Sequence, residues 1–255
     1  MSADPPRHLQ HCLLLHRRDF SNTSLLVEVF SATHGRFPAV AKGARRARSG
    51  AAALLQPFQP LWLGWSGRGE VRTLGRVEAA GAPLALRGDA LYCGFYLNEL
   101  LMRVLARSDP HEDLFAFYLS ALQGLASGES LDSVLRRFEL RLLQILGYGL
   151  VLDREADTGR PVLEAGHYRY VPERGIVPGD DNRIAEDGLT GATLLRLSGD
   201  QALEGEQIRE ARRLLRAALA PHLGSRPLVS RALFRRARSP AAPATKQGQA
   251  PHSGD

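Results

Sequence analysis

The sequence predicts an α+β protein in which a small β-barrel or sandwich precedes a mostly α-helical region. Short segments rich in strand-forming residues, separated by glycine-bearing turns, occupy residues 1–80. Beyond residue 81, apolar residues recur close to every 3.6 positions, as in amphipathic helices. The hydrophobic fraction of 44% is sufficient for a core, and the chain has no apolar run of the roughly 18 residues that a membrane helix needs.

The β region is predicted from short segments with turns between them. Residues 31–35 and 66–69 carry glycine and small polar side chains, which favour tight turns. Closing such short strands into a barrel removes the exposed edges that they would otherwise present. The expected strands cover residues 13–15, 24–30, 36–41, 61–65 and 71–74.

The helical region is predicted to begin after residue 83. Asp89 is expected to cap the first helix. A second start signal lies at 109–112, where a capping aspartate, a proline and a glutamate follow each other at helix-start spacing. A third helix is expected over 130–146, and Gly147 is a typical C-terminal stop.

Residues 150–190 are rich in glycine, proline and acidic side chains, which predicts a loop with a short hairpin around 168–177. Helices are expected again over 192–197, 206–219 and 229–238. The chain after residue 239 has too few apolar groups to order itself. The predicted organisation is therefore a barrel domain (1–80), a helical domain with an irregular 150–190 segment (81–238) and a disordered tail (239–255).

The net charge of +6 comes from the first third of the chain. Residues 1–80 hold eleven basic and five acidic side chains, and the remaining 22 basic and 22 acidic side chains cancel. Such asymmetry indicates a polyanionic partner for the barrel domain.

Residues 41–50 form a segment of small residues and cations. Small neighbours let long cationic side chains reach a phosphate backbone, and each neutralised phosphate releases counterions. An ordinary solvated loop is the alternative interpretation. Phe37 and one of the two tryptophans are expected to be exposed and able to stack on bases. The expected DNA-binding cations, gathered by a barrel, are Arg17, Arg18, Arg36, Lys42, Arg45, Arg46 and Arg48.

No catalytic residue, cofactor or metal site is predicted. The phosphate-loop, dinucleotide, zinc-protease and serine-hydrolase motifs are absent from the sequence. His8, His11, Cys12 and His16 have ligand-like spacing, but strand alternation would point His11 and Cys12 apart. The two cysteines do not fit a disulfide framework, and the N-terminus does not resemble a signal peptide, so a cytoplasmic, nucleoid-associated location is expected.

An ordered series of short motifs runs from about residue 13 to residue 236. It resembles the RecO family of bacterial recombination mediators, which act in the RecF pathway. The motifs are DFSNTSL (19–25), GR (35–36), VAKGAR (40–45), LQPF (55–58), GRGEV (67–71), YLNELL (96–101), RRFEL (136–140), GYG (147–149), YRY (168–170) and SRALF (230–234).

The resemblance implies an N-terminal OB-fold barrel and a helical C-terminal domain. It also implies binding of single- and double-stranded DNA, annealing of complementary strands, and help in loading RecA onto strands coated by single-stranded-DNA-binding protein, together with RecR. Some relatives carry a four-cysteine zinc site between the helices. Residues 150–190 contain no cysteine, so the chain resembles the zinc-free branch, and packing must hold this segment.

The resemblance implies two sets of site residues. Lys42 and Arg45 match the DNA-contact positions, with Arg46 and Arg48 as neighbours. Arg136 matches a position that meets the acidic C-terminal tail of single-stranded-DNA-binding protein, which needs an apolar pocket beside a cation. Tyr92, Phe95, Arg137 and Leu150 are expected to complete that pocket.

Two other functions stay open at this point. The barrel domain could be a scaffold whose basic face binds an acidic protein instead of DNA. For Arg136 and Arg137, an ordinary exposed helical face is the alternative interpretation. A nuclease is the other possibility, but it would need clustered acids to hold a divalent metal, and the basic domain lacks such a cluster in its sequence.

Overall fold

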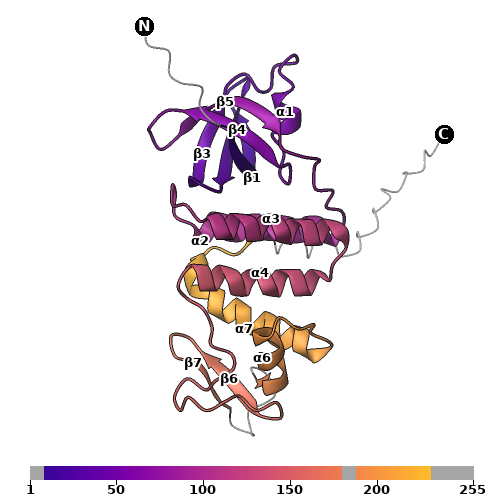
Figure 1. Ribbon diagram of the computed structural model, residues 1–255. Coiled ribbons are helices and arrows are strands. Elements are labelled where there is room, and N and C mark those ends of the chain that lie inside the picture. The colour runs from indigo at the N-terminus through magenta and orange to yellow at the C-terminus, as the bar shows by residue number, and fades with distance from the viewer. Residues whose placement is uncertain (1–8, 180–187, 231–255) are drawn as a thin grey trace, which may run out of the picture.

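The computed structural model describes residues 9–179 and 188–230. A barrel, a layer of helices and a smaller mixed lobe follow one another along the molecule (Figure 1). The predicted α+β class, with the barrel first, is confirmed. The expected tail at 239–255, the part of the expected last helix beyond residue 230, and His8 lie outside the described residues.

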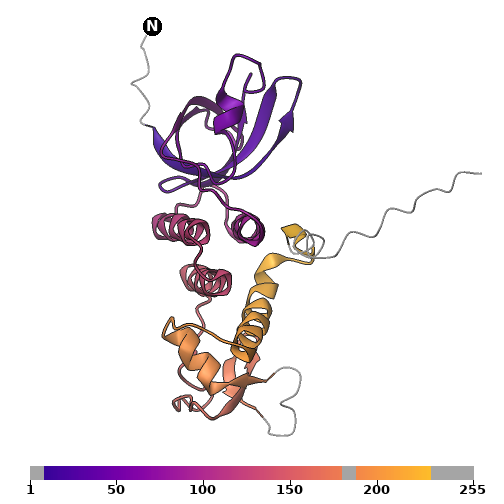
Figure 2. The ribbon, with the colours of Figure 1, turned by 90° about the vertical axis from the view of Figure 1, so that its right-hand side faces the viewer.

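Within residues 9–179, five strands close into a barrel in the order β1-β2-β3-β5-β4, visible as a ring in Figure 2. The β3–β5 pair is parallel and the other pairs are antiparallel. A short helix between β3 and β4 completes the OB-fold arrangement. The elements are β1 (Gln10–Phe20), β2 (Ser24–Ser31), β3 (Gly35–Ala41), α1 (Ala51–Leu54), β4 (Leu61–Ser66) and β5 (Arg72–Ala79).

Side-chain alternation along the strands fills the barrel. On β3, Phe37, Ala39 and Ala41 point inward, so Phe37 is completely buried. The expectation that Phe37 is exposed is therefore wrong, because its strand position places it on the inner face. Trp62 is the more exposed tryptophan, at 41%, whereas Trp65 packs against the Phe37 ring.

The helical domain packs α2, α3, α4 and α7 around one apolar core. Helix α4 begins close to the expected residue 130, and the Ser130 side chain caps it by accepting a hydrogen bond from the Ser133 backbone N–H. Gly147, with a φ of 84°, follows the end of α4 in the left-handed conformation expected of a helix stop. The bounds are α2 (Asp89–Val104), α3 (Glu112–Ser127), α4 (Leu131–Ile145) and α7 (Glu206–Leu223).

Two predicted helix starts differ from the structure. The N-cap of α2 is Gly88, and Asp89 occupies the first turn, where its charge favours the helix dipole. Helix α3 begins at Glu112, later than the start signal at 109–112 indicates. The residues before α3 contact the barrel instead, since Arg107 forms an isolated β-bridge with Arg36.

The smaller lobe contains a sheet of described strands in the order β7-β6-β8, backed by α6 and the first part of α7 (Figure 1). The hairpin expected around 168–177 corresponds to β6 and β7. Apolar packing between this sheet and the helices, including Tyr168, Ile176 and Leu194, holds the segment. The bounds are β6 (His167–Val171), β7 (Gly175–Pro178), β8 (Leu189–Thr190) and α6 (Gly191–Ser198).

A β-bulge joins the barrel to the helical domain. The register of β1 on β2 shifts between Leu14 and His16, which leaves Leu15 without a partner residue on β2. The Asn98 side-chain amide of α2 donates to the Leu15 carbonyl at 2.9 Å, and the Tyr118 hydroxyl donates to Asn98 Oδ1 at 2.5 Å. A buried polar network therefore satisfies the backbone carbonyl that the bulge leaves unpaired.

The connection between α2 and α3 forms a second junction. The Ser108 N–H donates to the Arg36 carbonyl at 2.8 Å, where this part of β3 is not paired with β5. Gly35 has a φ of 65°, and a Cβ at that position would lie 2.0 Å from the Asp109 carbonyl oxygen. Glycine is needed here both for the left-handed backbone and for the close approach of the two domains.

Among the described residues, no helix combines the length and apolar character needed to cross a membrane.

Candidate nucleic-acid interface and partner pocket

The basic segment and the β1–β2 turn form one platform at an end of the barrel. The Arg45 backbone N–H donates to the Thr23 carbonyl at 2.9 Å. The Arg45 guanidinium pairs with Asp19 at 3.0 Å and donates to the Ser21 carbonyl at 3.3 Å. Arg45 therefore ties the two loops together, and part of its charge is already neutralised.

Strand register places Arg18 and Phe20 on the outer face of the barrel. Arg18 lies opposite Leu26, and Leu26 lies opposite Val40 on β3. Directly opposite residues share a face of the sheet, so these side chains form one row. Phe20 lies two residues after Arg18, on the same face, and is 45% exposed. OB-folds bind oligonucleotides with the face of strands 2 and 3 and the adjoining loops.

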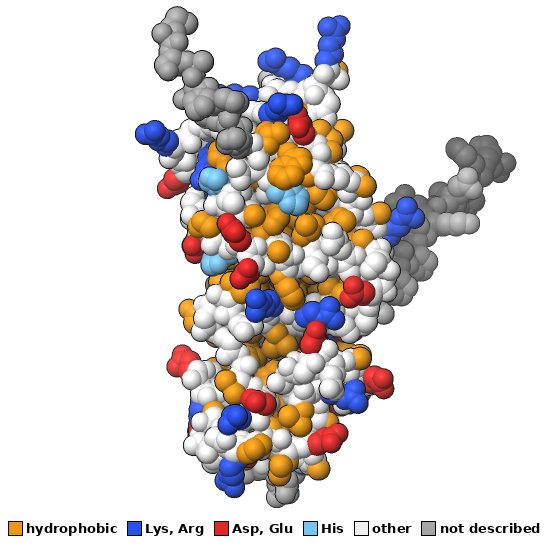
Figure 3. Space-filling model, viewed as in Figure 1, with side chains coloured by type: hydrophobic (Ala, Val, Ile, Leu, Met, Phe, Trp, Pro, Cys, Tyr) orange, Lys and Arg blue, Asp and Glu red, His pale blue; other side chains and the backbone are white. Residues whose placement is uncertain are grey.

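Four exposed cations lie on β1 and in the segment after β3 that adjoins the β1–β2 turn: Arg18, Lys42, Arg46 and Arg48. Their side chains make no hydrogen bond or ion pair with the described residues. Together with Phe20 they are called the loop patch below. Figure 3 shows basic side chains projecting from the barrel end of the molecule, whereas both signs of charge mix over the helical domain and the lobe.

The structure gives two other predicted cations internal partners. The Arg17 guanidinium donates to the Ala52 and Leu55 carbonyls at 3.2 and 3.1 Å, next to α1. Arg36 pairs with Glu28 at 2.5 Å and donates to the Leu105 carbonyl at 2.9 Å. Both guanidinium groups therefore support the fold, and the expectation of DNA contact rests on the loop patch.

Sequence reasoning did not single out Phe20. Simple alternation from the buried Leu14 would place Phe20 inside the barrel. The bulge at Leu15 reverses the alternation and turns Arg18 and Phe20 outward. Asp19 and Ser21 flank Phe20 and favour a turn at this position. An aromatic residue at a turn was the signal from which the exposure of Phe20 could have been predicted.

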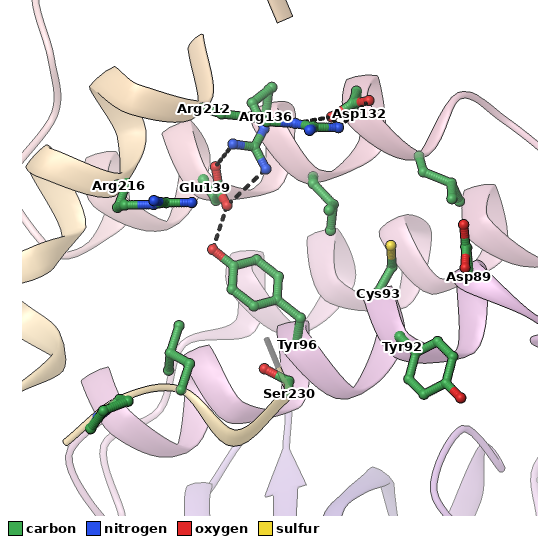
Figure 4. A pocket seen from close by; sticks show the side chains of 14 residues that line it. Asp89, Tyr92, Cys93, Tyr96, Asp132, Arg136, Glu139, Arg212, Arg216 and Ser230 are labelled. Carbon is green, nitrogen blue, oxygen red and sulfur yellow. Dashed lines mark hydrogen bonds and ion pairs between the residues drawn. The ribbon is translucent and has the colours of Figure 1, made fainter. Parts of the chain in front are cut away.

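A pocket of about 600 Å³ lies in the helical domain, between α2, α4, α7 and residues 227–230 (Figure 4). This volume falls within the range of ligand sites in proteins. Of the five residues predicted for tail binding, Tyr92 and Arg136 line the pocket. The lining residues are Asp89, Tyr92, Cys93, Tyr96, Leu131, Asp132, Leu135, Arg136, Glu139, Arg212, Arg216, Pro227, Leu228 and Ser230.

The other three residues predicted for tail binding lie elsewhere. Phe95 packs against Phe58 of the barrel domain, with ring centroids 5.1 Å apart. Arg137 pairs with Asp200 at 3.0 Å. Leu150 packs against the helical core. The helical period explains the first two positions, because Phe95 and Arg137 are each one residue, or about 100°, from the pocket-lining Tyr96 and Arg136.

The Arg136 charge is already paired. Its guanidinium lies 3.0 Å from the Glu139 carboxylate, and both side chains are at least 90% buried. The Tyr96 hydroxyl also donates to Glu139, at 2.5 Å. Arg136 Nε has no hydrogen-bond partner among the described residues, so the buried pair retains a donor.

Two arginines of α7 differ in how much of their charge is available. Arg212 makes a bidentate ion pair with Asp132, at 2.9 and 2.8 Å. Arg216 is exposed and makes no ion pair with the described residues, and Figure 4 shows it reaching toward Glu139. Among the described residues that line this pocket, the available cation is therefore Arg216, which sequence reasoning missed because α7 is distant from α2 and α4 in the chain. Tyr96 was also missed, although it lies one helical turn after Tyr92.

Both cysteines are neutral thiols at physiological pH. Burial, with Asp89 and Asp132 nearby, raises the pKa of Cys93 to about 11, and burial raises the pKa of Cys12 to about 12. Cys12 points into the barrel, whereas His11 lies outside against the Trp62 ring. In the described part of the chain, no group of three or more histidine, cysteine, aspartate or glutamate side chains could hold a metal ion.

The architecture defines a class of protein: an OB-fold barrel joined to a helical domain with a pocket of about 600 Å³. Comparison with known families is more specific. Residues 6–82 match the family model described as "Recombination protein O N terminal", and residues 86–232 match "Recombination protein O C terminal". The chain belongs to the RecO family.

Curated relatives cover nearly the whole chain. The protein named "DNA repair protein RecO" of Methylococcus capsulatus is 50% identical over 235 residues, which is 91% of this chain and 96% of that protein. Proteins of the same name from Alkalilimnicola ehrlichii and Nitrosospira multiformis are 48% and 43% identical, over 92% of this chain in each case and 96% and 98% of their own lengths.

Proposed function

We propose that this protein is a recombination mediator in DNA repair. It binds single- and double-stranded DNA, anneals complementary strands, and with RecR helps to load RecA onto strands coated by single-stranded-DNA-binding protein. The observation that carries the proposal is the loop patch, where exposed cations and an exposed aromatic ring occur together on an OB-fold barrel. The relatives are named DNA repair proteins, which supports a role in DNA repair.

The first step is docking of the coated strand. The acidic tail of single-stranded-DNA-binding protein enters the pocket of the helical domain, where Tyr92, Cys93 and Leu228 offer apolar contact. Arg216 meets the carboxylates of the tail, because it forms no ion pair with the described acidic residues. Charge-assisted hydrogen bonds of this kind are stronger than neutral ones.

The second step is neutralisation of the DNA backbone. Arg18, Lys42, Arg46 and Arg48 bind phosphates, and Arg45 holds the loops that carry them. Binding lowers the repulsion between two strands, each of which is a dense line of negative charge. Base pairing then supplies the free energy of annealing, so no nucleotide hydrolysis is needed.

Annealing assays on bare and on coated complementary strands test both surfaces. The double variant Arg46→Glu/Arg48→Glu should lose annealing on both kinds of strand. Arg216→Ala should lose it only on coated strands. We choose Arg216 in preference to Arg136, since Arg136→Ala would leave the buried Glu139 carboxylate without its cation and destabilise the fold.

Matched controls separate local contacts from overall charge. Arg154→Glu/Arg169→Glu makes the same change in net charge on exposed residues of the lobe. Arg209→Ala removes an exposed arginine from α7 that does not line the pocket. Normal annealing by the Arg46→Glu/Arg48→Glu variant would contradict the assignment of the loop patch to DNA binding. If the unaltered protein failed to anneal strands but bound an acidic protein in a salt-dependent way, the scaffold function would replace the mediator role.

A further inference from the structure

The segment after α7 forms one wall of the pocket. Residues 224–230, called the strap below, lie against α2, and Pro227, Leu228 and Ser230 line the cavity. Leu228 is the strap's buried apolar anchor, whereas Val229 is 63% exposed. A segment with so few apolar contacts needs other interactions to offset the conformational entropy that it loses when ordered, about 1–2 kcal/mol per residue.

An ion pair on α2 supplies those interactions. Arg103 donates to the carbonyls of Leu223, Arg226 and Pro227, at 3.1, 2.5 and 2.9 Å. Glu99 accepts hydrogen bonds from the backbone N–H groups of Val229 and Ser230, at 3.0 and 2.9 Å.

Two further contacts close the arrangement. The Ser230 hydroxyl donates to Glu99 at 2.7 Å. Arg103 and Glu99 are themselves paired at 2.8 Å, and their side chains are 20% and 17% exposed.

We propose that Glu99 and Arg103 are positioning residues for the tail pocket: they hold the strap as its wall without touching the bound peptide. Neither residue lines the cavity. Both continue the line of Tyr92 and Tyr96 along α2, so one helix carries part of the pocket and the groups that hold its wall. This inference rests on the proposed docking of an acidic tail.

The consequence for binding is a population effect. When a binding-competent conformation is only fractionally populated, the apparent affinity falls by that fraction. Loosening the strap therefore weakens peptide binding although every residue that contacts the peptide is intact. It also makes peptide binding and strap ordering mutually reinforcing, because a coupling between two events acts in both directions.

The test measures two quantities on the full chain. The first is the affinity for a short fluorescein-labelled peptide, rich in aspartate and ending in a phenylalanine with a free carboxylate. The same peptide with an amidated C-terminus is the probe control. The second is hydrogen exchange at the Val229 and Ser230 amides, which Glu99 protects directly.

Glu99→Gln should weaken peptide binding by about tenfold. It should speed exchange at Val229 and Ser230 but not in the middle of α4, and saturating peptide should restore protection. Arg103→Lys keeps the charge but loses the planar fork, and should weaken binding roughly threefold. If Glu99→Gln does not fold, Arg103→Lys tests the positioning role by itself. Glu112→Gln, an exposed glutamate on α3, is the matched control and should match the unaltered protein.

The outcomes separate this inference from the proposed function. If the variants bind the peptide as tightly as the unaltered protein, or exchange at Val229 and Ser230 is unchanged, the positioning role is overturned and tail docking stands. If the unaltered protein does not distinguish the free-carboxylate peptide from the amidated one, tail docking falls and the inference falls with it. Annealing of bare strands should be the same for all variants.

Discussion

Individual side chains differ in how much of their chemistry remains available to a partner. Arg17 and Arg36 donate to backbone carbonyls inside the molecule, whereas Arg46 and Arg48 project into solvent. Since a guanidinium that already has partners must break those bonds to bind a phosphate, the exposed cations are the ones suited to DNA. The ring of Phe20 adds a surface on which a base can stack.

Phe20→Ala should weaken binding of single-stranded DNA through loss of stacking, by about 1–3 kcal/mol. The dependence of affinity on salt should not change, because no phosphate contact is removed. Arg46→Ala should instead reduce the magnitude of the slope of log affinity against log salt concentration by about 0.7. Fluorescence anisotropy over a salt series measures both quantities.

Trp62→Ala is the comparison variant for Phe20→Ala. Trp62 has a similar exposed fraction, 41%, but its ring contacts His11, away from the cations of the loop patch. We expect this substitution to leave single-strand affinity unchanged. An equal loss from both variants would indicate a nonspecific effect of removing aromatic surface and would contradict the role of Phe20.

Among the elements, the α2–α3 connection determines how the two domains meet. Its residues add to β3 where β5 leaves that edge unpaired, through the Ser108–Arg36 hydrogen bond. Because Asp109 approaches Gly35 so closely, there is no room for a side chain at position 35. The domain junction thus depends on a backbone contact as well as on the apolar packing of Phe30 against α3.

Gly35→Ala should reduce the free energy of unfolding by about 2–4 kcal/mol, through left-handed strain and the clash with Asp109. Gly159→Ala is the matched control, since Gly159 has a φ of 68° and open space around it. It should cost only about 1 kcal/mol. Urea denaturation measures both, and equal losses would show that the domain contact does not restrict position 35.

Over the whole molecule, the loop patch and the pocket lie on different domains of one chain. The proposed mechanism needs both surfaces on the same molecule. Docking of the tail raises the effective concentration of the coated strand near the barrel of that molecule.

Mixing the Arg46→Glu/Arg48→Glu variant with Arg216→Ala should therefore not restore annealing of coated strands. Each variant has only one working surface, and docking by one molecule does not bring a strand to the barrel of another. The annealing rate of the mixture, compared with equal amounts of each variant alone, measures this. Full recovery would contradict action by a single chain.

The sequence by itself determined the α+β class, the order of barrel and helices, most element positions, the basic character of the barrel domain and the family resemblance. These properties follow from composition, local periodicity and short motifs, which depend on residues near one another in the chain. The hairpin at 168–177 and the Gly147 stop after α4 are examples, because each is specified within a few residues.

Only the tertiary structure decided which predicted residues are available to partners. Arg36 finds its carbonyl partner 69 residues away, and Glu99 meets Ser230 across 131 residues. The bulge at Leu15 turns Phe20 outward, and packing of α7 brings Arg216 to the pocket while Phe95 and Arg137 face elsewhere. Such contacts depend on how whole elements pack and in which register strands pair, and no local pattern of residues specifies either.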